Sequence, residues 1–289
     1  MNLSNLGALL APPIITSLWA KIRGRSGLPG WYGTYRSMDE ALDATRSMSY
    51  QNIAQDTSYI EGRLLPKPST QSKRHLDIKH LGILTSILTA CYAKERDTLI
   101  VLDFGGGAGL HFHRLRSFIP YGISLKWGIV ELPSVAEIGR TESTSHELTY
   151  FSSLEEFRQA YGIADIVIAS GVLQTMENPL ATLRELAVCG AYIILANLPL
   201  LRSESDFVAV NHAETPSYPL WFFSERKFVS ELPISGLHVL MYWQAPETFW
   251  VVNGARSQPA TSILAKSEVV ISDNNQRNLA SILDTDNGT

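Results

Sequence analysis

Hydrophobic and polar residues alternate along the middle of the chain in the pattern of short buried strands separated by amphipathic helices. Five apolar runs of strand length occur in order: LIVLDF (99–104), LKWGIVE (125–131), LTYF (148–151), ADIVIAS (164–170) and AYIILAN (191–197). A stretch with helical spacing follows each of the first four runs. Regular alternation of strands and helices is typical of a parallel sheet covered by helices on both faces.

Start signals mark several of the predicted helices. Ser37 with Glu40 and Ser153 with Glu156 have the spacing of a capping box, in which the two side chains satisfy free backbone N–H groups at a helix start. Proline heads two further helices, after residue 132 and in NPLATLRELAVCG. Apolar residues at helical spacing also predict a helix over about residues 75–93.

The C-terminal third predicts a change of strand direction. Two apolar runs, HVLMYW (238–243) and TFWVVN (248–253), are expected to pair as an antiparallel hairpin that closes the sheet. The fold class expected is therefore α/β: a Rossmann-like, doubly wound, mostly parallel sheet of about seven strands, with a C-terminal antiparallel hairpin and an N-terminal helical extension.

The chain divides into three parts on this pattern. Residues 1–72 are expected to form a docking segment and a helical extension, with the glycine-rich stretch 24–33 as a loop. Residues 73–265 hold the alternating strands and helices. Residues 266–289 are polar enough to predict a weakly docked tail.

Composition narrows the class of protein. A formal net charge of -4 with pI near 6.0, and no long Lys/Arg run, argue against a nucleic-acid partner. Two distant cysteines among 289 residues fit reduced thiols and a cytoplasmic location. No metal site is predicted, because no Cys or His pair has ligand spacing, and the histidines are expected to be surface or hydrogen-bonded side chains.

The N-terminal segment LGALLAPPIITSLWAKIRGR is apolar and then basic. A signal peptide has the opposite order, and Pro12-Pro13 would break a membrane-spanning helix. Two interpretations stay open: the segment packs on the domain, or residues 1–25 make a peripheral contact with a membrane surface.

Candidate chemistry centres on LIVLDFGGGAGL, where glycines follow a buried strand that contains an Asp near its end. Glycine lets the backbone turn sharply and lets a ligand approach its N–H groups. The dinucleotide fingerprint requires glycines at relative positions 1, 3 and 6, but Leu110 occupies the sixth position after Gly105. Asp103 would repel a pyrophosphate and suits a ligand that bears an amino group.

The pattern of Asp103, Gly105, Gly107 and Gly109 resembles motif I of the class I S-adenosylmethionine (SAM)-dependent methyltransferases. The resemblance implies that residues 73–265 form a SAM-binding methyltransferase domain. It further implies that Glu131, at the end of the second strand, binds the ribose hydroxyls. The remaining cofactor-binding positions that it implies are Gly106, Phe151, Ser152, Ser170 and Gly171, with Val172 beside them.

A narrower resemblance reaches the flanking segments. GWYGTYRSMDEALDAT and SYPLWFFSERKF are similar to the signatures of a bacterial methyltransferase group that is often associated with surface-polysaccharide biosynthesis genes. The function expected for the chain is methyl transfer to a small-molecule or glycan-related acceptor, at oxygen, although the motifs of this group do not settle what it methylates. The oligomeric state is not indicated by the sequence.

The acceptor site is expected in the segment LPLLRSESDFVAVNHAETPSYPLWFF, which predicts a long loop that acts as a lid. His212 and Tyr218 are the candidate catalytic residues there, and His75 and His80 are further candidate bases. Two other functions stay open. A non-catalytic SAM-fold binding module would keep the same sheet, and a nicotinamide-dependent oxidoreductase would share its topology.

Overall fold

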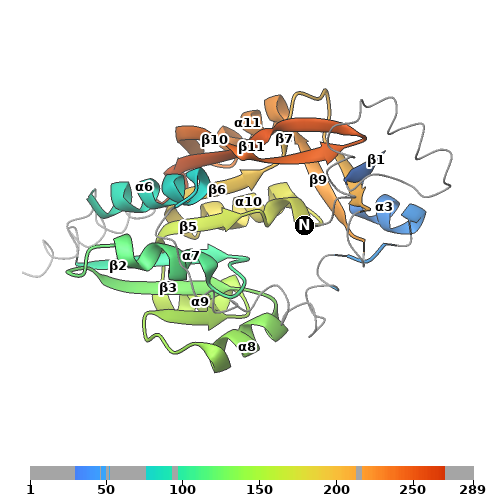
Figure 1. The fold of residues 1–289 in the computed structure, drawn as a ribbon. Coiled ribbons are helices and arrows are strands. Elements are labelled where there is room, and N and C mark those ends of the chain that lie inside the picture. Colours follow the sequence, from blue (N-terminus) through green and yellow to red (C-terminus); the bar gives the residue numbers. More distant parts are fainter. Residues whose placement is uncertain are drawn as a thin grey trace, which may run out of the picture.

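The structure is a computed structural model that describes residues 30–45, 47–49, 52, 76–92, 97–212 and 217–270. These residues form one eleven-stranded sheet in the order β4-β3-β2-β5-β6-β11-β10-β1-β8-β9-β7 (Figure 1). The strands are β1 (Trp31–Tyr35), β2 (Thr98–Phe104), β3 (Ser124–Val130), β4 (Leu148–Phe151), β5 (Ala164–Ser170), β6 (Gly190–Leu198), β7 (Leu200–Leu201), β8 (Phe207–Asn211), β9 (Pro219–Ser224), β10 (Leu237–Val252) and β11 (Ala255–Ser267).

Helices flank both halves of the sheet. They are α3 (Met38–Thr45), α6 (Ile78–Tyr92), α7 (Leu110–Leu115), α8 (Pro133–Glu142), α9 (Leu154–Tyr161), α10 (Pro179–Ala187) and α11 (Glu225–Ile234), with short 3-10 turns η2 (Arg116–Phe118) and η3 (Leu173–Thr175). Buried side chains of α6, α7 and α8 form a core on one face. Those of α9, α10 and α11 form a core on the other.

The five strands from β4 to β6 are parallel, as the alternating pattern predicts. Their side chains are buried on both faces because helices cover both, so the strands are continuous apolar runs rather than alternating ones. The N-cap bond of each predicted capping box also forms: the N–H of Glu40 bonds to Ser37 Oγ, and that of Glu156 to Ser153 Oγ, each at 3.1 Å. The two Glu carboxylates accept the N–H groups of Arg36 and Ser152, one residue before each cap. The predicted α/β fold is confirmed.

The C-terminal antiparallel pair is confirmed, but its composition differs from the prediction. Residues 238–243 and 248–253 do not pair with each other, since nearly all of them belong to the single strand β10, and its hairpin partner is β11. The register shifts between Ala245 and Phe249, around Pro246. A proline is tolerated in a strand at such a bulge, so it does not end β10 as the sequence pattern suggested.

Two segments expected to be loops are strands. Residues 31–33 of the glycine-rich stretch lie in β1, between β10 and β8. The predicted lid after the fifth strand contains β7 and the antiparallel pair β8 and β9. Of these strands, β9 contacts the turn that follows β5 at the carboxyl edge of the parallel half, where the indole N–H of Trp221 donates to the Met176 carbonyl at 3.1 Å. The lid prediction was therefore wrong about the backbone, although the segment does reach the edge where ligands bind.

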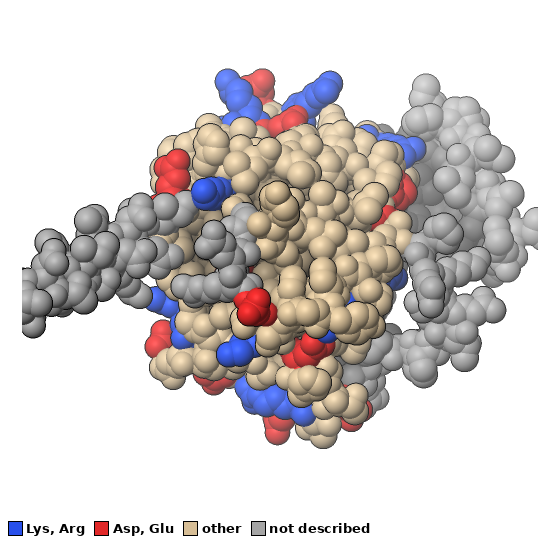
Figure 2. Space-filling view, turned by 90° about the vertical axis from the view of Figure 1, so that its left-hand side faces the viewer, with Lys and Arg blue, Asp and Glu red and all other residues tan. Residues whose placement is uncertain are grey.

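On the face seen in Figure 2, basic and acidic side chains lie side by side toward the margins and the lower part, and an area of the centre is uncharged. No helix among the described residues is long and apolar enough to cross a membrane. The predicted docking segment at residues 1–25, most of the C-terminal tail and His75 lie outside the described residues.

Candidate active site

The glycine turn after β2 has a backbone that only glycine adopts readily. Gly105, Gly107 and Gly109 have φ of 68°, 56° and 79°, in the left-handed region. A Cβ at Gly105 would lie 2.5 Å from Val172 Cγ2, and one at Gly106 would lie 2.7 Å from Asp103 Cγ. The turn is packed too closely for side chains, and it leads directly into α7.

Asp103 supports this turn from beneath. Its side chain is fully buried, and both carboxylate oxygens lie 3.1 Å from His111 Nδ1. The indole N–H of Trp127 donates to Asp103 Oδ2 at 3.3 Å. Because a carboxylate only accepts, the His111 nitrogen that faces it carries the proton. The sequence suggested that Asp103 faces a ligand, whereas its oxygens here are bonded to two protein side chains.

Glu131 directly follows β3, and its side chain is hydrogen-bonded to the glycine turn that follows β2. Its Oε1 accepts the N–H of Gly107 and its Oε2 accepts the N–H of Leu132, both at 3.0 Å. Burial raises the pKa of Glu131 above its ordinary value; the two backbone hydrogen bonds oppose this shift, and the nearby charge of Asp103 adds to it. The structure thus places Glu131 against the glycine turn, where the resemblance implies a ribose-binding carboxylate.

The two positions suggested after β4 have other contacts. The ring of Phe151 is 7% exposed and packs edge-to-face on Phe157 and Tyr161. The hydroxyl and the N–H of Ser152 both donate to the Glu156 carboxylate, at 2.6 and 2.8 Å. The Phe151 ring therefore belongs to the core, and the Ser152 side chain is hydrogen-bonded to the first turn of α9, just before its N-cap Ser153.

The segment after β5 lies beside the glycine turn at the carboxyl edge of the sheet. Gly171 has φ of 72°, and Val172 contacts Gly105 across the turn. Ser170 and Gly171 are half-buried. The fold therefore brings together the glycine turn, Glu131 and residues 170–172, which is the switch point where ligands bind in open α/β sheets.

His212 and Tyr218 make their ring contacts with β1. His212 is exposed, with its ring centroid 5.3 Å from that of Tyr32. Tyr218 is 8% exposed and packs edge-to-face on Trp31, with the ring centroids 5.4 Å apart. Neither contact reaches the glycine turn.

The buried His80 pairs with Asp77, an exposed carboxylate at the start of α6. Its Nδ1 lies 2.6 Å from Asp77 Oδ1, and its ring centroid lies 5.7 Å from that of His111. Burial lowers the pKa of His80 to about 4, although the hydrogen bond to Asp77 raises it. The His80 ring next to His111 is therefore neutral at neutral pH. The described residues contain no group of three side chains that could hold a metal ion.

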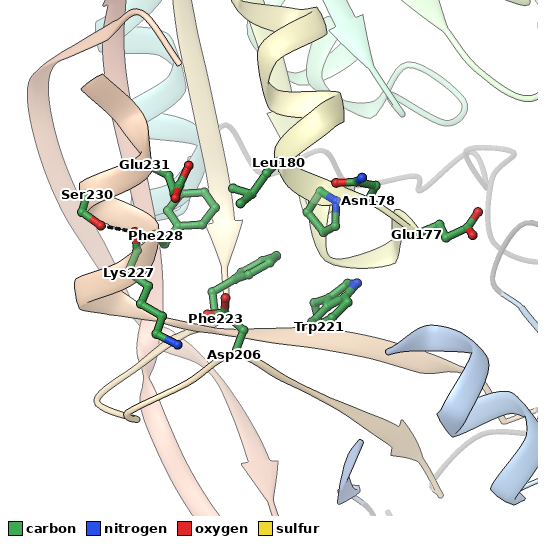
Figure 3. Close-up of a pocket in the computed structure, with 11 residues that line it drawn as sticks. Glu177, Asn178, Leu180, Asp206, Trp221, Phe223, Lys227, Phe228, Ser230 and Glu231 are labelled. Carbon is green, nitrogen blue, oxygen red and sulfur yellow. Dashed lines mark hydrogen bonds between the residues drawn. The ribbon is translucent and has the colours of Figure 1, made fainter. Parts of the chain in front are cut away.

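Two clefts flank the loop between η3 and α10. One, of about 330 Å³, is lined by Met38, Asp39, Leu42, Ser49, Thr175, Glu177 and Pro219. The other, of about 290 Å³, lies between α10, β9 and α11 (Figure 3). In Figure 3 Trp221 and Phe223 line the second cleft from β9, and Glu177 points away from the other lining side chains. Glu177 lines both clefts, so they meet at this loop.

The sequence does not reveal the partners of Asp103. His111 is hydrogen-bonded, as expected for the histidines, but the sequence did not indicate its partner, and Trp127 reads as an apolar residue inside a strand. The signal that could have found the first is that His111 lies on the first turn of α7, directly beyond the glycines.

No protein-family model matches the chain, and no curated protein matches it. Solved structures similar to the chain include magnesium protoporphyrin IX methyltransferase from Synechocystis PCC 6803 with bound SAM, at 17% identity over 75% of this chain and 95% of that one, with a TM-score of 0.47. Human N-acetylserotonin methyltransferase in complex with SAM is 16% identical, over 66% of this chain and 52% of that one, with a TM-score of 0.43.

A third similar structure is an amino pentose methyltransferase from Micromonospora echinaspora involved in calicheamicin biosynthesis, with bound SAM. It is 14% identical, over 65% of this chain and 89% of that one, with a TM-score of 0.43.

Proposed function

We propose that the chain is a SAM-dependent methyltransferase that binds SAM at the carboxyl ends of β2 and β3. The observation that supports this most strongly is the pairing of the glycine turn with Glu131 at 3.0 Å. Glycines in the left-handed region leave the turn without side chains, so a ligand can approach it. A carboxylate beside such a turn suits a ligand with vicinal hydroxyls.

The donor and acceptor capacity of Glu131 fits a ribose. Each of its oxygens accepts one backbone N–H, and a carboxylate oxygen has lone pairs for a further hydrogen bond. Two hydroxyls can therefore bind without displacing the turn. When bound, SAM supplies an electrophilic methyl group on a sulfonium. The protein's part is then to orient the acceptor and exclude water from this edge of the sheet.

A nicotinamide cofactor fits less well. Leu110, a half-exposed leucine at the first position of α7, stands where a dinucleotide turn has its third glycine. A non-catalytic module is disfavoured because a degenerate copy would usually lack one of the glycines or Glu131, and all of them are present here.

We infer that the acceptor is a small molecule or saccharide that is methylated at oxygen. The 330 Å³ cleft beside η3 supports this, because Asp39 and Glu177 offer carboxylates to hydroxyl groups and Met38, Leu42 and Pro219 offer apolar contacts to a ring face.

Calorimetric titration with S-adenosylhomocysteine and with NAD tests the cofactor. Binding of S-adenosylhomocysteine and not of NAD is expected. Glu131→Gln should weaken that binding about 10-fold, since a hydrogen bond to a charged group contributes about 1.5 kcal/mol. Glu137→Gln on the exposed face of α8 is the matched control and should bind like wild type.

The same titration has a predicted pH dependence. The ionised form of Glu131 accepts the hydroxyls, and its pKa is raised, so affinity should fall as the pH drops through a value above the ordinary carboxyl pKa. Glu131→Gln should abolish this dependence. Binding of NAD alone, or a Glu131→Gln affinity equal to that of wild type, would contradict the proposed site.

A further inference from the structure

Gln174 lies in η3, just beyond β5, and is 3% exposed. Its Nε2 donates to the main-chain carbonyl of Asn197 at 3.1 Å. That contact defines the orientation of the amide, because a carbonyl can accept but not donate. Gln174 Oε1 is then buried, and no group in the described part of the chain donates to it.

Asn197 is the neighbour of Gln174 at the end of β6. It has φ of 58°, one of two non-glycine residues with positive φ among those described. Its N–H donates to Ser262 Oγ at 3.3 Å, but its side-chain Oδ1 is buried without a donor among the described residues. A left-handed Asn within a strand is held there by its surroundings.

The contacts of Gly171 show where the amides of Gln174 and Asn197 lie in the site. A Cβ on Gly171 would lie 3.1 Å from Asn197 Nδ2 and 3.7 Å from Gln174 Nε2, so both amides pack against this glycine. The next residue, Val172, contacts Gly105. The two amides therefore lie where the segment after β5 meets the glycine turn.

Buried polar atoms in folded proteins nearly always have a hydrogen-bond partner, and an unpartnered one destabilises the fold. Two unpartnered carbonyl oxygens occur here on adjacent side chains. They lie at the carboxyl ends of neighbouring strands, the place where α/β sheets bind ligands. Both oxygens accept hydrogen bonds, so the missing partner is a donor.

We propose that Gln174 and Asn197 form a subsite that accepts hydrogen bonds from a protic group, N–H or O–H, of a bound ligand. This inference rests on the proposed function, which offers two sources for that group: the amino group of the cofactor's amino-acid end and the nucleophile of the acceptor. An amide oxygen does not take up a proton at neutral pH, so the pair positions the group and leaves its proton in place.

Three probes separate the two sources. S-adenosylhomocysteine carries the amino-acid end, 5′-methylthioadenosine lacks it, and sinefungin carries an amine where SAM has its methyl group. The affinity difference between sinefungin and S-adenosylhomocysteine reports on the methyl-transfer position. The difference between S-adenosylhomocysteine and methylthioadenosine reports on the cofactor's amino group.

The variants are Gln174→Met, which removes both polar atoms, Gln174→Glu, which keeps an accepting oxygen, and Asn197→Gly, which keeps the left-handed backbone. Gln159→Met on the exposed side of α9 is the control. Gln174→Met and Asn197→Gly should each reduce one of the two affinity differences about 10-fold, while Gln174→Glu retains it. A purely structural role in tethering η3 would instead make Gln174→Glu as harmful as Gln174→Met.

Each outcome has a distinct meaning. Loss of the sinefungin preference supports an acceptor-positioning subsite, and loss of the S-adenosylhomocysteine preference supports recognition of the cofactor's amine. If both affinity differences between the probes were unchanged in all variants, the proposal would be overturned, and water would be the partner of the two amide oxygens. If wild type binds none of the probes, the proposed function itself fails, and this inference fails with it.

Discussion

The two ends of the candidate site differ in whether the protein itself supplies hydrogen-bond partners for their buried polar atoms. At the glycine turn, the carboxylates of Asp103 and Glu131 each receive hydrogen bonds from protein donors. At the ends of β5 and β6, Gln174 and Asn197 each keep a buried oxygen without a donor among the described residues. The first region is preorganised without a ligand, while the second has hydrogen-bonding capacity that a ligand can satisfy. Mutations in the two regions should therefore separate stability from recognition.

Asp103→Ala should give the largest loss of stability. The substitution leaves the buried donors of His111 and Trp127 without an acceptor, and each unpaired buried donor costs about 1–3 kcal/mol. We expect the free energy of unfolding, measured with urea, to fall by about 3 kcal/mol. Asp103→Asn keeps one accepting oxygen and should lose less. Equal midpoints for Asp103→Ala and wild type would mean that the turn does not depend on this support.

Gly105→Ala tests the contact that joins the two regions. The added methyl would meet Val172 at 2.5 Å and would also occupy a left-handed backbone position. Gly162→Ala is the matched control, because Gly162 has φ of 75° and its added methyl would meet no atom within 4 Å beyond its chain neighbours. Overlap in a packed site costs about 1–3 kcal/mol, so Gly105→Ala should be about 2 kcal/mol less stable than Gly162→Ala. Matching urea curves for the two variants would show that the turn can move away from Val172.

Gln174→Met should give the smallest loss of stability. It removes one hydrogen bond, from Nε2 to the Asn197 carbonyl, and it also removes the unpartnered oxygen, which offsets the loss. We expect a fall of about 1 kcal/mol in the free energy of unfolding, within the range for a single hydrogen bond. A loss as large as that of Asp103→Ala would place Gln174 among the structural supports and remove the contrast between the two regions.

The parallel half of the fold could be predicted because its signals are local. Each strand from β2 to β6 is one apolar run, and the start signal of α9 lies within the four residues from Ser153 to Glu156. The other half depends on partners far away in the sequence. β1 is a strand only because β8 and β10 lie on either side of it, and Pro246 hides the continuity of β10 until the bulge is seen.

The candidate site divides in the same way. The glycine turn and Glu131 could be predicted from a motif and from its place at the end of the next strand. The support of Asp103 by Trp127, 24 residues away, and the amide pair across β5 and β6 could not, because burial and hydrogen bonding of those groups arise from packing. Phe151 and Ser152 show the limit of carrying positions over from a resemblance, since both side chains have partners of their own.

The pairing of β1 with β10 has a consequence for synthesis on the ribosome. Asn253 Oδ1 accepts the N–H of Gly33 at 2.9 Å, across 220 residues of sequence. The parallel strands can pair as they emerge, but β1 waits for almost the whole described chain before its neighbours exist. Contacts of such long range slow folding and leave strand edges exposed to other chains in the meantime. The nascent protein is therefore expected to be most prone to aggregation late in translation, after β8 and β9 have emerged and before β10 has.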